Sequence, residues 1–229
     1  MKKIIFISLF LVISVSVFSQ KNKKVQLPYA GVSFSGASTW LINKWVFDKG
    51  DEQDIAASFG YSVGAVAGYY FKDNFGVEVN ILYNAHNMKY TGEVFLNKYD
   101  SQTSLKFTDI PVLFKAGKET YFEIGPVFSF LNKAEYCIES NGNKNTKNVK
   151  SDFKSSGINV AFGFGVNIEV TKQVFINTGL RLMYGLTDIK GVDAIGYSKS
   201  DYSSNADGID DFKNNIASGV IHLGVIYQF

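Results

Sequence analysis

The chain has little cysteine, histidine or proline: its 229 residues include one cysteine, two histidines and three prolines. The single Cys137 cannot form an internal disulfide, and it excludes a zinc site built from several cysteines. His86 and His222 show no metal-ligand spacing, and the sequence has no phosphate-binding loop or nucleophile motif. We therefore expect no catalytic residues, no cofactor, no cofactor-binding residues and no metal site, and we do not expect an enzyme.

An excess of charge of one sign is also lacking once the N-terminal segment is set aside. Lys2 and Lys3 precede an apolar run from Ile4 to Phe18, and the small Ser19 follows it. The run is shorter than the roughly 20 residues that a membrane-spanning helix needs, so residues 1–19 are predicted to be a secretory signal peptide. Without the two lysines the formal net charge falls from +2 to zero. Nothing in this balance favours a nucleic acid as partner.

The rest of the chain, residues 20–229, repeats a period-2 alternation that indicates β-strands. In residues 158–170 one face carries Ile158, Phe162 and Phe164, whereas the other carries glycine, alanine and polar residues. An all-β barrel of about 210 residues forms a single domain. The pattern predicts about eight strands, at residues 29–42, 58–71, 75–85, 105–116, 120–134, 158–170, 174–188 and 215–229.

The connections between these strands alternate between short and long. The short ones are residues 72–74, 117–119 and 171–173, and the long, polar ones are residues 43–56, 89–103, 135–153 and 189–213. Short periplasmic turns and long extracellular loops are typical of membrane barrels. We therefore predict an all-β fold: an eight-stranded antiparallel up-and-down transmembrane β-barrel with its apolar face outward and both termini periplasmic. The alternative is a lipocalin-like soluble barrel, but its surface would carry glycine, serine and alanine where soluble proteins carry lysine and glutamate.

The final nine residues, IHLGVIYQF, carry an apolar face that ends on an aromatic residue. They resemble the terminal strand by which the barrel-assembly machinery recognises bacterial outer-membrane barrels. The resemblance implies the cell outer membrane as location, with its lipid and that machinery as partners. The predicted assembly signal consists of Leu223, Val225, Tyr227 and Phe229.

Four motifs resemble a family. FTDIPVLFKAG at 107–117, YFEIGPVFSFL at 121–131, GLRLMYGLTDI at 179–189 and the terminal LGVIYQF occur in an order and spacing similar to the PorT-like outer-membrane β-barrel proteins of Bacteroidetes, within the porin family. The resemblance covers essentially the whole chain after the signal peptide. The family's eponymous member takes part in protein secretion, so the resemblance implies secretion-system components as partners. Gly179 stands where relatives often carry an acidic residue two positions before the arginine.

Outward apolar faces place polar side chains inside the predicted barrel. An eight-stranded barrel has a lumen just wide enough to be filled by side chains, so we interpret these residues as an internal polar plug. The predicted luminal cluster consists of Glu78, Asp109, Lys115, Glu123, Glu169, Arg181 and His222. The aromatic residues near the short turns are predicted to form a periplasmic girdle, namely Tyr69, Tyr70, Phe71, Phe75, Tyr121, Phe122, Tyr227 and Phe229.

These features favour a non-enzymatic outer-membrane protein with a structural or interaction role, linked to protein secretion as the resemblance suggests. Two alternatives stay open. One is a small pore, which needs a continuous wet path. The other is an enzyme acting on lipid or peptide at the barrel rim, with His86 beside Asn84 and Asn87 as its candidate site.

Overall fold

The computed structural model describes residues 28–42, 54–72, 74–94, 97–140, 142–193, 196–198 and 213–229. The predicted signal peptide lies outside these residues. No helix among them is long and apolar enough to cross a membrane.

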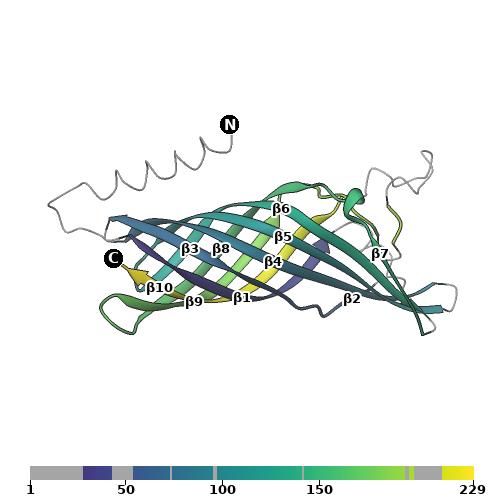
Figure 1. The fold of residues 1–229 in the computed structure, drawn as a ribbon, viewed down its shortest axis with the longest axis horizontal. Coiled ribbons are helices and arrows are strands. Elements are labelled where there is room, and N and C mark those ends of the chain that lie inside the picture. Colours follow the sequence, from purple (N-terminus) through teal and green to yellow (C-terminus); the bar gives the residue numbers. More distant parts are fainter. Residues whose placement is uncertain are drawn as a thin grey trace.

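Eight long strands form a closed antiparallel barrel (Figure 1). Each strand pairs with its sequence neighbours around the ring, and pairing of the first with the last closes it. The all-β, eight-stranded, up-and-down prediction is therefore confirmed. The strands are β1 (Tyr29–Ile42), β3 (Gly60–Lys72), β4 (Phe75–Val94), β5 (Asn97–Ala116), β6 (Thr120–Ser140), β8 (Ser156–Glu169), β9 (Val174–Gly185) and β10 (Asn215–Gln228).

The barrel has two unlike ends. One, which we call the turn end, carries Lys72 and Asn74 at the ends of the β3–β4 connection, the connections at 117–119 and 170–173, and Pro28 and Phe229. At the opposite loop end β4, β5 and β6 continue well past the other strands, and they project at the right of Figure 1. Two short strands, β2 (Asp54–Ala56) and β7 (Asn143–Asn148), pair with β4 and β6 in this projection.

The prediction of long loops at 89–103 and 135–153 is wrong. β4 and β5 stay paired as far as Val94 and Asn97, and β6 continues to Ser140 before β7 folds back along it. A change in the phase of the alternation explains the error. Phe75, Val77, Ile81 and Tyr83 point outward, whereas from Leu82 onward the apolar side chains Leu82, Met88 and Tyr90 point inward and are buried.

The outer surface is apolar only along a central band. On β4 the band runs from Phe75 to Tyr83, and on β6 from Phe122 to Phe130, close to the roughly 9–11 residues with which a strand spans a bilayer. Beyond Phe130 a bulge in β6 leaves Lys133 exposed, with Glu135 at 2.8 Å. The apolar band therefore ends where the projecting sheet begins.

A hydrophobic core of buried side chains, which we call the loop-end core, closes the loop end from inside. It contains Leu41, Met88, Tyr90, Tyr99, Leu105, Phe107, Leu131, Ala134, Tyr136, Val149, Phe153, Ile189, Val192 and Ile216. Two connections cover it: the segment around η2 (Lys150–Asp152) and residues 186–193, joined by the hydrogen bond from the Lys154 amide to the Ile189 carbonyl at 2.9 Å. β9 ends at Gly185 instead of residue 188 because the chain turns there to build this cap.

Candidate functional site

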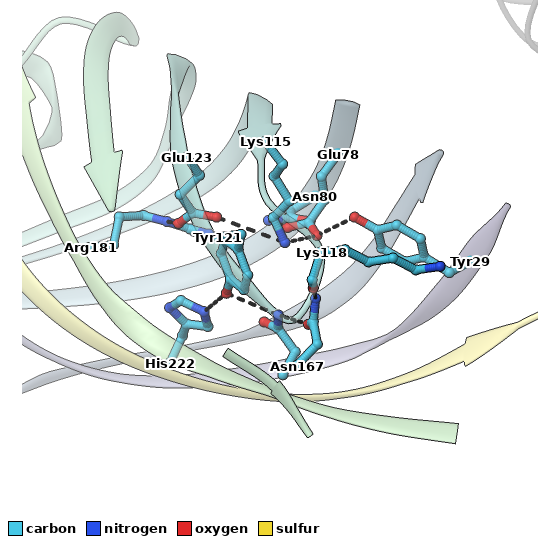
Figure 2. Close-up of polar contacts among 11 residues, drawn as sticks. Tyr29, Glu78, Asn80, Lys115, Lys118, Tyr121, Glu123, Asn167, Arg181 and His222 are labelled. Atoms are coloured by element: carbon cyan, nitrogen blue, oxygen red, sulfur yellow. Dashed lines mark hydrogen bonds and ion pairs between the residues drawn. The ribbon is translucent and has the colours of Figure 1, made fainter. Parts of the chain in front are cut away.

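Four charged side chains of alternating sign meet inside the barrel near the turn end (Figure 2). Lys115 of β5 lies 2.5 Å from Glu78 of β4 and 3.9 Å from Glu123 of β6. Arg181 of β9 donates to Glu123 at 2.6 Å. All four side chains are at most 6% exposed, and their formal charges cancel. We call these four residues the charge layer.

Glycines on intervening strands allow this layer to form. Gly163 lies in register between Glu123 and Arg181, and a Cβ there would stand 2.8 Å from Glu123 Oε1. Gly68 lies in register between Tyr29 and Glu78, and the Tyr29 hydroxyl donates to Glu78 at 2.8 Å across it. Absence of a side chain on the middle strand thus lets the outer two strands bond to each other.

A longer row of the same kind joins β6 to β10. Tyr121, Gly165, Gly179 and His222 lie in register on four successive strands. The Tyr121 hydroxyl lies 2.9 Å from His222 Nε2, and Asn177 donates to the same hydroxyl at 2.9 Å. A Cβ on Gly165 would stand 2.4 Å from the Tyr121 hydroxyl oxygen and 2.5 Å from the Thr178 carbonyl oxygen, so this position has no room for a side chain.

Asp109 lies in a separate buried group closer to the loop end. It accepts a hydrogen bond from Asn84 and lies 4.0 Å from His86 Nε2. Thr39 Oγ1 is 2.9 Å from His86 Nδ1 and 3.2 Å from Ser218 Oγ. The order of hydroxyl, imidazole and carboxylate is that of a nucleophile with its base, but 4.0 Å is too long for a hydrogen bond.

Five of the seven predicted luminal residues meet in and beside the charge layer, and Asp109 is buried in the separate group. Glu169 does not join them: it is exposed at the turn end, where it lines a cavity with Glu119. Two residues of the predicted girdle also lie elsewhere, since Tyr70 and Tyr121 are 6% and 0% exposed and face the interior. His86 is buried in the lumen and not at the rim.

The functional residues missed from sequence are Tyr29, Thr39 and Tyr121. Each lies on the inward face of its strand, so the alternation of inward and outward positions along the strand is enough to predict that these side chains face the lumen. The sequence prediction assigns Tyr121 to the girdle because it is aromatic, and it assigns no role to Tyr29 or Thr39. The glycines opposite Tyr29 and Tyr121 were the second available signal, because an inward glycine between two polar neighbours leaves a space that they can share.

A closed barrel that is apolar outside and ion-paired inside defines a membrane-spanning β-barrel, since lipid demands a surface without unpaired backbone edges or charges. The chain belongs to the outer membrane protein beta-barrel domain family, whose sequence profile matches residues 18–191. Its location is accordingly the outer membrane. No curated protein sequence matches the chain.

The fold is similar to those of solved outer-membrane proteins, of which three examples follow. Neisserial surface protein A is 15% identical, with 88% of this chain and 97% of that chain covered and a TM-score of 0.41. OprG of Pseudomonas aeruginosa is 12% identical, with 91% and 98% covered and a TM-score of 0.45. The outer membrane protease OmpT of Escherichia coli is 13% identical, with 92% and 99% covered and a TM-score of 0.39.

Proposed function

We propose that the chain is a non-enzymatic, non-conducting outer-membrane protein that binds a partner through its projecting loop-end sheet. The observation that carries the proposal is the filled lumen. Successive layers occupy it from the turn end to the loop end: the Tyr29 and Tyr70 rings, the charge layer, the buried group around Asp109, and the loop-end core. A pore needs a continuous wet path, and apolar packing at Leu105 and Leu131, which are 0% and 6% exposed, interrupts one.

The enzyme alternative is disfavoured by access. Thr39 and His86 are 0% and 3% exposed, and the hydrophobic core covers them from the loop end. Among the described residues a substrate therefore has no route to the hydroxyl, which supports reading the group as hydrogen bonding that satisfies buried polar atoms. Loss of an activity in His86→Ala, with retained folding, would be required of an enzyme.

The projecting sheet supports the interaction role. Residues 84–94 of β4 continue past the apolar band for roughly 35 Å of strand, and their partners on β5 extend equally far. The outer side of this sheet is polar, with Asn87, Gln102 and Ser104 joined by hydrogen bonds of 2.8 to 3.4 Å. Its edges are already paired with β2 and β7. The PorT-like resemblance suggests a secretion-system component as partner.

Two measurements test this function. Purified protein in planar bilayers should give no channel events, and in cells a crosslinked partner should be lost when residues 91–100 are replaced by Asn-Gly. Because Tyr90 and Ser101 face each other across the two strands, a two-residue turn can join them. The variant loses Tyr99 from the loop-end core, but the ring of eight strands is untouched, so heat-modifiable gel mobility should remain. Discrete conductance, or partners retained by the shortened variant, would refute the proposal.

The orientation of the barrel is open to a labelling experiment. We propose that the loop end is extracellular, so Cys137, which is partly exposed on β6 opposite Thr146, should react with a membrane-impermeant maleimide on intact cells. A cysteine at exposed Lys172 in the 171–173 turn, in a Cys137→Ser background, serves as the matched control and should react only after the outer membrane is opened. The reverse pattern would place the termini outside.

The last residue tests the assembly signal. Leu223, Val225, Tyr227 and Phe229 lie on the outer face and are 41–54% exposed. Phe229 contacts the Tyr227 ring at 5.2 Å and its amide donates to Pro28 at 3.0 Å, so deleting it removes few contacts from the lumen. We expect folding in detergent to survive and outer-membrane abundance to fall severalfold, measured by heat-modifiable mobility and fractionation. Unchanged abundance would mean that Phe229 carries no targeting information.

A further inference from the structure

Two lysines lie side by side on the outer surface, where the apolar band ends toward the loop end. Lys106 of β5 and Lys133 of β6 are directly opposite each other in the strand register, and we call them the lysine pair. Leu105 and Phe107, on either side of Lys106, are buried at 0% and 2%, so Lys106 points outward. The Lys133 side chain is 48% exposed. Like charges directly opposite across two strands destabilise a sheet, so this arrangement lacks a counter-ion.

A bulge in β6 creates the lysine pair. The register shifts between Lys106 and Phe107 of β5, and Asn132 is the extra residue that has no partner on β5. Asn132 and Lys133 are therefore both exposed, although successive strand residues normally point to opposite faces. Bulges often serve to re-aim a side chain in this way. Asn132 donates to the Thr108 hydroxyl at 2.9 Å, so its direction along the outer surface is fixed.

Glu135 neutralises only one of the two lysines. Its Oε1 atom lies 2.8 Å from Lys133 Nζ, whereas Lys106 forms no ion pair among the described residues. The side chains of Lys133 and Glu135 are 48% and 37% exposed, and ion pairs in contact with solvent contribute little stability. An anion that contacts both lysines can thus displace Glu135 from Lys133.

The surface around the lysine pair is ordered like a lipid molecule. Tyr83, Thr108 and Phe130 lie in one row of the register on β4, β5 and β6. The two rings are 39% and 46% exposed and are the last outward aromatic residues of the apolar band on their strands. Lys106 lies two residues nearer the loop end than Thr108, a distance of about 7 Å along the strand. Apolar rings, a polar row and a cationic row thus follow one another within one lipid headgroup's reach.

From these observations we propose that the lysine pair binds the phosphate monoester of a membrane lipid whose acyl chains lie along the apolar band beside Phe130. Such a phosphate carries about two negative charges at neutral pH, which matches two lysines. The ammonium groups donate to the phosphate oxygens in charge-assisted hydrogen bonds, which are the strong ones, and the lysine stems cover apolar surface. This binding site goes beyond the proposed loop-end interaction and does not depend on it.

Phosphatidic acid and phosphatidylcholine with identical acyl chains are matched probes, because only the first has a phosphate monoester. Native mass spectrometry of the purified protein, released from maltoside micelles that contain both lipids in equal amounts, measures which lipid stays bound. We expect phosphatidic acid to exceed phosphatidylcholine at least about tenfold, the equivalent of one charge-assisted hydrogen bond. Lys106→Gln and Lys133→Gln should each reduce this ratio severalfold. Glu135→Gln should increase it, because it frees Lys133.

Two exposed lysines in separate turns of the turn end, Lys118 and Lys172, provide the control for unspecific attraction. The double variant Lys118→Gln, Lys172→Gln should keep the wild-type ratio, and an excess of inorganic phosphate should not release the lipid. Heat-modifiable mobility verifies that each variant is folded.

Three results would overturn the proposal: equal binding of the two lipids, an unchanged ratio in the double variant Lys106→Gln, Lys133→Gln, or an equal loss in the turn-end control. Release of the lipid by inorganic phosphate would overturn it as well, because the site would then bind the free anion. A channel in the bilayer experiment, or partners retained by the shortened variant, would refute the proposed function and leave this result unaffected.

Discussion

Phe164→Arg is expected to lower the free energy of unfolding by roughly 2–4 kcal/mol, the cost of a cationic side chain at the bilayer midplane on the lipid face of a barrel. Phe164 lies in the middle of β8, is 49% exposed, and has Phe122 and Leu180 beside it on the outer surface. Urea titration of the purified protein in lipid vesicles, followed by tryptophan fluorescence, gives the difference by linear extrapolation.

Phe164→Leu is the matched control, because it keeps the surface apolar and should cost much less. Equal stability of the arginine and leucine variants would contradict the assignment of this face to lipid. The neighbouring Gly165→Ser, although it points inward, is not a neutral control. The structure places Tyr121 and the Thr178 carbonyl where its side chain would lie, so that change should itself be destabilising.

Arg181→Met is expected to lower the free energy of unfolding by about 3 kcal/mol, the low end for breaking a buried ion pair by removing one partner. The substitution leaves Glu123 buried without its 2.6 Å donor. Lys115 remains 3.9 Å away and compensates in part. The same urea titration measures the loss.

The double variant Glu123→Gln, Arg181→Met provides the control for charge. It removes one acid and one base, so the Glu78–Lys115 pair remains neutral, and part of the stability should return. A double variant no more stable than Arg181→Met would show that packing of the arginine stem matters instead of its charge. Wild-type stability in the single variant would indicate that lumen water hydrates Glu123.

Much of the barrel could be predicted from sequence because lipid imposes one rule on every strand. Outward apolar residues at every second position, as at Ile158, Phe162 and Phe164, fix both the strand and its inner face. The rule stops where the membrane stops. Beyond Tyr83 the outer face meets water and the inner face packs against other apolar residues, so Met88 and Tyr90 are out of phase with the outward apolar residues. The pattern therefore predicts a loop where the β4–β5 hairpin continues.

The buried polar residues could be predicted only as a set. Inward parity places Glu78, Lys115, Glu123 and Arg181 inside, but their partners depend on strand register and tilt, which the sequence does not show. Asp109 consequently lies apart from the charge layer, beside His86. Glu169 has the correct parity, yet it lies at the very end of β8, where the wall gives way to solvent.

The Tyr121–His222 contact also measures the curvature of the wall. These residues are three strands apart, and in a flat sheet their backbones would be separated by roughly 14 Å, with side chains standing parallel. A separation of 2.9 Å between the hydroxyl and imidazole nitrogen requires that the sheet be rolled until the two side chains converge. The contact therefore crosses the inside of the curved wall and links β6 directly to β10. It resists flattening, widening or lateral parting of the wall between β6 and β10, and the two glycines beneath it keep its path clear.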